Sequence, residues 1–183
     1  MKRNIYKFIF YNLMGWKISG TGNPEIKKSV YMILPHTSWH DFYIGAFTRG
    51  VLDFEINFVG KKELFDSVFG FYFKYMGGAA LDRKGGLNKV DAIVEIFKTK
   101  DIFRLGISPE GTRKKVSELK TGFYFIAQKA NVPIIPVAFN YKSKTVLFGN
   151  PFLCTNNYEN DLSILKNHFK NATGKIPKND FTF

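Results

Sequence analysis

The sequence predicts a single α/β domain with a largely parallel central sheet flanked by helices, on three observations. The first is size: 183 residues, 45% of them apolar, can bury a hydrophobic core without covalent cross-links. The second is the lone cysteine, Cys154, which excludes an internal disulfide framework and a cysteine-based zinc site. The third is the order of patterns along the chain, in which short apolar runs alternate with longer stretches of helical spacing.

The short apolar or β-branched runs predict the strands. They are expected at residues 30–34, 55–59, 78–81, 102–107 and 133–139, with an edge strand at 145–148. The helical patterns between them cover residues 41–49, 62–75, 89–98, 122–130 and 162–169. Functional side chains of such sheets gather at the carboxyl ends of strands. The residues that follow Leu34, Leu81 and Ile107 are therefore expected to lie together.

Residues 1–18 are predicted to form an amphipathic membrane-docking helix ahead of a domain over residues 19–183. At helical spacing one face carries large apolar side chains: Ile5, Phe8, Ile9 and Trp16. Lys7 and Asn12 interrupt the apolar stretch, so it is neither a secretory signal nor a membrane span. The pattern alone leaves two interpretations open, a helix lying in the membrane interface or a helix packed on the sheet. The net charge of +12 predicts a polyanionic partner, either nucleic acid or an anionic membrane surface.

The first polar cluster contains His36 and Asp41, five residues apart. They can meet if His36 lies in the turn after the strand and Asp41 in the first helical turn. Asp41 would then fix one imidazole nitrogen and leave the other free to take a proton from a hydroxyl. Two other interpretations are a metal site using His36 and His40, for which no third ligand is evident, and a pair that only caps the helix.

The second and third clusters carry positive charge. Arg83 follows a short buried strand, and Gly111 precedes Arg113 in a turn able to aim N–H groups at an anion. A solvated basic loop is the alternative. Ser108 partly fits a hydrolase nucleophile turn, but Pro109 lacks the N–H that the oxyanion hole of such a turn needs. An RNA-binding pattern near residues 120–125 has the wrong spacing, so we expect no nucleic-acid partner.

Four motifs follow one another in order. His36 to Asp41 fits H-x4-D, and Gly77 to Arg83 fits G-x4-D-R. Ser108 to Arg113 fits F-P-E-G-T-R with Ser in place of Phe, and Val132 to Val137 fits V-P-[IV]-[IV]-P-V. Together they resemble the glycerophospholipid (1-acyl-sn-glycerol-3-phosphate) acyltransferase family, which makes phosphatidic acid. The resemblance covers about half of the chain.

The resemblance implies direct acyl transfer from acyl-CoA or acyl carrier protein to the hydroxyl of lysophosphatidic acid. It implies that His36 is the general base, oriented by Asp41, and that no metal or bound cofactor takes part. The acceptor's phosphate and glycerol would be bound by five residues: Arg83, Glu110, Gly111, Thr112 and Arg113. Pro133 would lie on the acyl-donor side.

Pro35, Ser108 and His40 depart from the family's motifs and leave the acceptor open. Lysophospholipids with larger heads and lyso-ornithine lipid are alternative acceptors, and a non-catalytic anionic-lipid-binding module is the alternative of another class. Because the product has two acyl chains, the resemblance favours membrane docking, peripheral or monotopic. We expect this docking on the cytoplasmic face of a bacterial inner membrane, since no targeting signal is evident in the sequence. A cluster of aromatics is expected to form a second apolar surface, an acyl-tunnel wall or packed core: Phe65, Phe69, Phe71, Tyr72, Phe73 and Tyr75.

Overall fold

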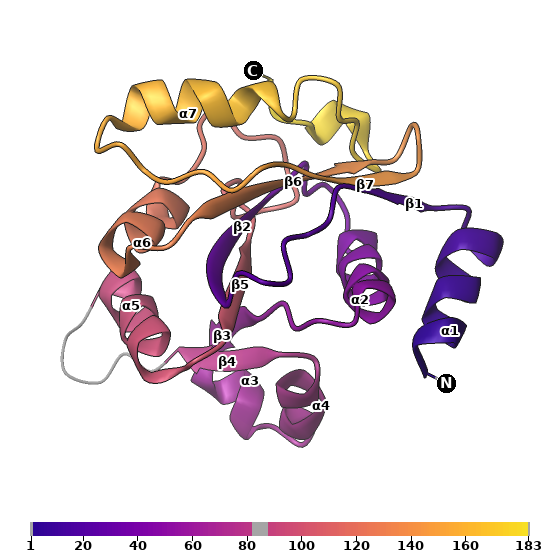
Figure 1. The fold of residues 1–183 in the computed structure, drawn as a ribbon, viewed down its shortest axis with the longest axis horizontal. Helices are drawn as coiled ribbons and strands as arrows, with labels where there is room; N and C mark the ends of the chain where they lie inside the picture. The colour runs from indigo at the N-terminus through magenta and orange to yellow at the C-terminus, as the bar shows by residue number, and fades with distance from the viewer. Residues whose placement is uncertain (1, 82–87, 183) are drawn as a thin grey trace.

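The computed structural model describes residues 2–81 and 88–182, and a five-stranded sheet lies at its centre (Figure 1). The strand order is β1-β7-β6-β2-β5. The strands are β1 (Lys17–Ser19), β2 (Lys28–Leu34), β5 (Phe103–Ile107), β6 (Ile134–Asn140) and β7 (Thr145–Phe148). β2 pairs in parallel with both β5 and β6, β1 pairs in parallel with β7, and only the β6–β7 pair is antiparallel. The predicted fold class, α/β with a largely parallel sheet, is confirmed.

A small second sheet lies beside β5. It consists of β3 (Phe58–Lys61) and β4 (Gly78–Leu81), which pair in parallel. A single parallel bridge between Asn57 and Leu105 joins the chain leading into β3 to the edge of the main sheet. Asn57 also donates its side-chain amide to Gly77 and accepts the backbone N–H of Arg104. This one buried asparagine therefore ties the two sheets together.

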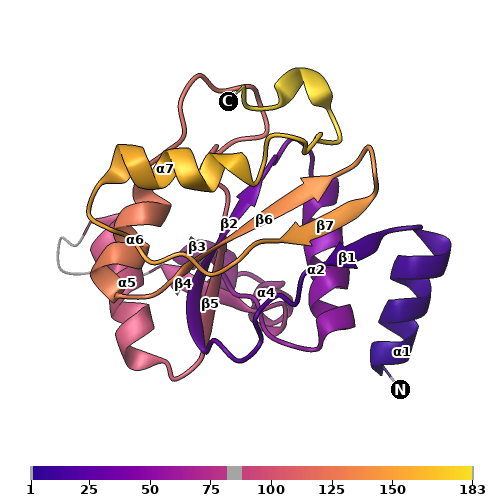
Figure 2. The same cartoon turned by 45° about the horizontal axis from the view of Figure 1, so that its top comes forward.

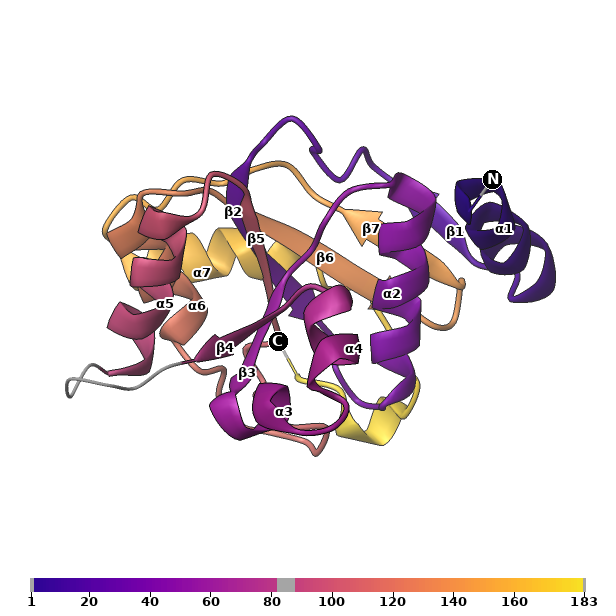
Figure 3. The same cartoon turned by 90° about the horizontal axis from the view of Figure 1, so that it is seen from below.

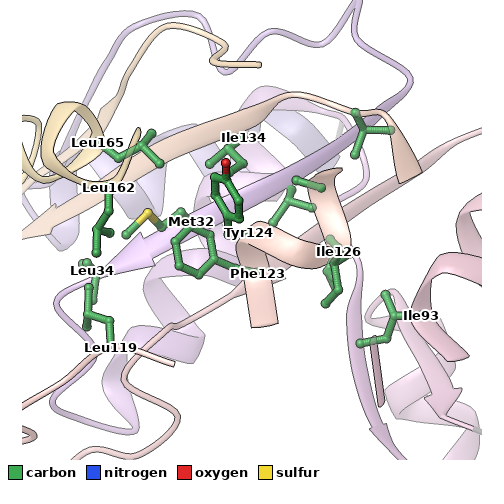
Figure 4. Packing of buried hydrophobic residues seen from close by; sticks show 14 of the residues in the cluster. Met32, Leu34, Ile93, Leu119, Phe123, Tyr124, Ile126, Ile134, Leu162 and Leu165 are labelled. Atoms are coloured by element: carbon green, nitrogen blue, oxygen red, sulfur yellow. The ribbon is translucent and has the colours of Figure 1, made fainter. Parts of the chain in front are cut away.

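Helices cover both faces of the main sheet (Figure 2). One face carries α5 (Lys89–Thr99), α6 (Gly122–Ala130) and α7 (Tyr158–Asn167), and the other carries α2 (His40–Leu52). Alternate residues of β2 point to the two layers, so that Met32 and Leu34 face α6 and α7 while Tyr31 faces α2. Figure 4 shows the first of these layers, with Phe123 of α6 packed beside Met32 and Ile126 on the side toward Ile93. Burial on both faces explains why residues 30–34 of β2 are apolar without interruption.

The amino-terminal segment differs from its prediction. It forms α1 (Lys2–Lys7) and a π-helical segment η1 (Phe8–Leu13), so the helix ends five residues early and the chain continues as β1. β1, not β7, is therefore the edge strand on the side of the sheet opposite β5. Trp16 lies beyond the helix, is 5% exposed and packs on the Tyr141 ring, which removes it from the expected docking face; Ile5 and Phe8 are exposed. None of the helices within residues 2–81 and 88–182 is long and apolar enough to span a bilayer.

The stretch predicted as one helix over residues 62–75 forms two. They are α3 (Lys62–Asp66) and α4 (Gly70–Tyr75). The break follows from close backbone packing, because a Cβ atom at Gly70 would overlap the carbonyl of Phe65. α7 begins four residues earlier than predicted because the Asn157 side chain accepts the N–H of Asn160 and caps the helix.

Candidate active site

His36 and Asp41 form the pair that their spacing predicts. Pro35 follows β2 through a cis peptide bond, His36 lies in the turn, and α2 begins at His40. The Nδ1 atom of His36 lies 2.9 Å from Oδ2 of Asp41, whose side chain is 2% exposed, while that of His36 is 31% exposed. With the Nδ1 proton donated to Asp41, the free lone pair of the imidazole is on Nε2.

The Asp41 carboxylate is anchored by two further donors. Its Oδ2 accepts the backbone N–H of Ser38 at 3.0 Å, and its Oδ1 accepts the Tyr141 hydroxyl at 2.6 Å. Burial, followed by the hydrogen bond to Asp41 and its negative charge, raises the pKa of Tyr141 well above its ordinary value. Tyr141 is therefore a permanent donor, and Asp41 is held from three sides. The sequence analysis missed Tyr141, which follows β6 directly and comes close because β6 and β2 run in parallel.

Glu110 joins the third motif to the first. It is 1% exposed, and its Oε2 accepts the backbone N–H of His36 at 2.6 Å and the Ser108 hydroxyl at 3.1 Å. Burial raises the pKa of Glu110, and these hydrogen bonds act in the opposite direction. The sequence predicts an acceptor-binding role for Glu110; the structure adds a contact that no local pattern reveals, in which this carboxylate holds the turn that carries His36.

The turn after Glu110 is exposed and basic. Gly111 has a φ of 63°, in the left-handed region that glycine adopts at little cost, and the Lys120 side chain packs directly against it. Thr112 and Arg113 are exposed. The predicted anion-binding residues of the third motif thus face solvent close to the His36 turn, with Lys120 as an additional cation.

Residues 173–180, here called the C-terminal clasp, tie these segments together. The Tyr141 N–H donates to the Thr173 carbonyl at 2.8 Å, and the Ile176 N–H donates to the Thr37 hydroxyl at 3.1 Å. The Asn179 side-chain amide donates to the Arg113 carbonyl at 3.0 Å. One short segment therefore contacts the His36 turn, the end of β6 and the basic turn.

An apolar cavity of about 460 Å³ begins at the His36–Asp41 pair. His36, Asp41 and Ser108 line its polar end. Most of its remaining wall is hydrocarbon or aromatic and comes from the sheet, α2, the segment before β3 and α4: Ile33, Phe42, Gly45, Ala46, Ile56, Phe58, Phe73, Met76, Ile107, Val137 and Phe139. Its volume lies in the range of ligand pockets, and its lining suits an acyl chain.

Comparison with known proteins identifies the family. The Acyltransferase family model matches residues 16–140. The chain belongs to the Acyltransferase family. It is 28% identical over 139 residues to the 1-acyl-sn-glycerol-3-phosphate acyltransferase of Bacillus subtilis (strain 168), across 74% of this chain and 68% of that protein. The 1-acyl-sn-glycerophosphate (LPA) acyltransferase PlsC from Thermotoga maritima has the same fold, with a TM-score of 0.62 at 19% identity, over 92% of this chain and 75% of that one.

Two further site residues were predicted for this acyltransferase, Arg83 and Pro133. Arg83 falls outside the described residues. Pro133 precedes β6 at the amino end of the sheet, where its carbonyl accepts the N–H of Val30, whereas His36 follows the carboxyl end of β2. Within the described part of the acyltransferase, no group of three His, Cys, Asp or Glu side chains could hold a metal ion. His40 instead shares a hydrogen bond of 3.0 Å with the Ser38 hydroxyl through Nδ1.

Proposed function

We propose that this acyltransferase moves a fatty acyl chain from acyl-CoA or acyl carrier protein to the hydroxyl of 1-acyl-sn-glycerol-3-phosphate, forming phosphatidic acid. The observation that carries the proposal is the His36–Asp41 pair at the polar end of an apolar cavity, with Nε2 as the free nitrogen. The relatives' names supply the acceptor. Peripheral attachment to an anionic membrane surface, on the cytoplasmic side where the acyl donors are made, belongs to the same proposal.

The chemistry needs no nucleophile from the protein. Nε2 of His36 takes the proton of the acceptor hydroxyl as its oxygen attacks the thioester carbonyl. The C–S bond then breaks, and the imidazolium returns the proton to the leaving thiolate, giving an ester and a free thiol. Asp41 stabilises the imidazolium between the two steps and fixes its orientation. The Arg113 guanidinium is suited to the acceptor's phosphate, and Arg83 is proposed to act with it.

The test is an acyl-transfer assay on His36→Ala and the matched control His40→Ala. His40 lies in the same motif but bonds Ser38 rather than Asp41, so its removal leaves the pair intact. We expect kcat to fall about 1000-fold or more in His36→Ala and less than about threefold in His40→Ala. Equal losses in two folded variants would refute the role of His36.

The acceptor panel decides the substrate. It contains lysophosphatidic acid, lysophospholipids with larger heads and lyso-ornithine lipid, each with acyl-CoA and with acyl carrier protein as donor. We expect turnover on lysophosphatidic acid that falls about 10- to 100-fold in Arg113→Ala, mainly through KM. Turnover that is insensitive to Arg113→Ala would identify an acceptor without a phosphate, and folded protein without turnover on any acceptor would identify a lipid-binding module.

A further inference from the structure

Exposed aromatic side chains gather on α4 and the chain just before it. Five large apolar residues in this stretch of eight are exposed, and we call them the α4 patch: Val68, Phe69, Phe71, Tyr72 and Tyr75. Val68 is 86% exposed and Phe71 is 74% exposed, so these side chains protrude rather than pack. Contiguous exposed apolar side chains of this kind mark an interaction surface.

The opposite face of α4 closes the acyl cavity. Phe73 of α4 and Met76, which directly follows α4, line that cavity, and Phe42 and Gly45 line it from α2. The two helices lie next to each other in the ribbon (Figure 3). Phe73 also packs edge-on against Phe65, which is 3% exposed. One short helix therefore has the cavity on one side and the α4 patch on the other. The six aromatics of this region divide accordingly, with Phe65 in the core, Phe73 at the cavity and the other four at the surface.

The charges around the patch suit an anionic lipid surface. Lys74 is the only charged residue between positions 67 and 76. A second hollow of about 300 Å³ is lined by Tyr75 and Met76 on one side and by Lys2 and Arg3 on the other, with Asp53 and Glu55 also in its wall. Ile5 of α1 and Phe8 of η1, which follow these two basic residues in the chain, are exposed as well. Aromatic rings beside lysines and arginines are the composition of interfacial membrane anchors.

We propose that the α4 patch is a membrane-docking surface, which inserts its aromatic side chains into the headgroup region of an anionic leaflet. α4 then lies between the leaflet and the cavity, so a lipid chain has only the thickness of one helix to cross. Docking specifies the surface for the membrane attachment that belongs to the proposed function, and only the delivery step rests on the proposed acyl transfer. Docking through α1 alone would leave the exposed rings of α4 in water, so the α4 patch takes the role of the second apolar surface that the sequence analysis left open.

The test compares two triple variants in vesicle co-sedimentation without substrate. Val68→Ser/Phe69→Ser/Phe71→Ser removes side chains that do not line the cavity, and Phe125→Ser/Leu153→Ser/Ile164→Ser removes exposed apolar side chains on other elements. With phosphatidylcholine vesicles containing about 30% phosphatidylglycerol, we expect the first variant to partition about 30-fold more weakly than wild type and the second less than about threefold more weakly. Equal binding by the first variant and wild type would overturn the proposal.

Hydrogen exchange of the wild-type protein gives a result that does not depend on variant folding. We expect amides of residues 68–76 to become protected when vesicles are added, and unchanged exchange there in vesicle-bound protein would overturn the proposal. A wild-type dimer that the first triple variant abolishes would assign the patch to a second copy of the chain instead. Acyl transfer in detergent micelles separates the two proposals. If the first triple variant is active in micelles but inactive on vesicles, docking through the α4 patch is supported. If the wild-type protein shows no acyl transfer in either, only the proposed function is contradicted.

Discussion

Replacing Tyr141 by Phe removes one hydroxyl from the Asp41 carboxylate and leaves the ring in place. The ring contact with Trp16, 4.9 Å between centroids, and the backbone bond to Thr173 are both retained. What is lost is a 2.6 Å hydrogen bond to a buried carboxylate. Hydrogen bonds to charged groups contribute about 1.5–3 kcal/mol. Since a factor of ten in rate corresponds to about 1.4 kcal/mol, we expect kcat to fall about 10- to 100-fold.

The kinetic pattern distinguishes positioning from general damage. Asp41 without this donor has a less neutralised charge and attracts the imidazolium proton more strongly, so the acidic limb of the kcat/KM profile moves to higher pH. KM for the acceptor changes little, because Tyr141 does not line the cavity. The measurements are steady-state kinetics across pH and a thermal melt, with the exposed Tyr43→Phe as the control. A folded Tyr141→Phe with the rate and pH profile of wild type would refute the reasoning.

Three further predictions concern two buried carboxylates and one half-buried thiol. Glu110→Gln keeps a carbonyl oxygen for the His36 N–H and Glu110→Leu does not, so the leucine variant should lose about 10-fold more activity, and equal kinetics would contradict this. Burial alone raises the pKa of Asp161, but hydrogen bonds from Thr155 and Tyr124 outweigh it and lower that pKa. The Asp161 carboxylate therefore stabilises the fold at pH values above 3.8, its pKa in the unfolded chain. This contribution is lost as the pH falls through the lower pKa that Asp161 has in the folded protein. In urea unfolding at neutral pH, Asp161→Asn should have a free energy of unfolding about 2 kcal/mol below that of wild type. That free energy should also change less than in wild type as the pH is lowered. Burial and the nearby Asp161 charge raise the pKa of Cys154 to about 11, so iodoacetamide should label it far more slowly than glutathione at neutral pH, and a rate that levels off near pH 9 would contradict this.

The sequence predicted what local chemistry determines. The His36–Asp41 pair could be found because the two residues are close in sequence: His36 follows the end of a strand, and Asp41 lies in the first turn of the next helix. β2 could be found because a strand buried on both faces has a continuous apolar run. The four motifs predicted the family, and comparison with known proteins confirms it.

What the sequence analysis missed depends on contacts between distant parts of the chain. Tyr141 lies 100 residues from Asp41, and only the parallel pairing of β6 with β2 brings it near. Trp16 matched a helical face by spacing, but the chain leaves the helix before reaching it and a strand pairing takes over. The break before Gly70 arises from backbone packing, which the many aromatic residues from Phe69 to Tyr75 conceal.

The C-terminal clasp shows that the four motifs depend on a segment outside them. The family match ends at residue 140, one residue before Tyr141 and well before Thr173. A chimera that grafts only residues 16–140 onto another scaffold would carry the reacting histidine, yet not the segment that fastens its turn to the basic loop. Exchanging substrate preference between relatives therefore calls for transplanting residues 141–180 along with the motifs.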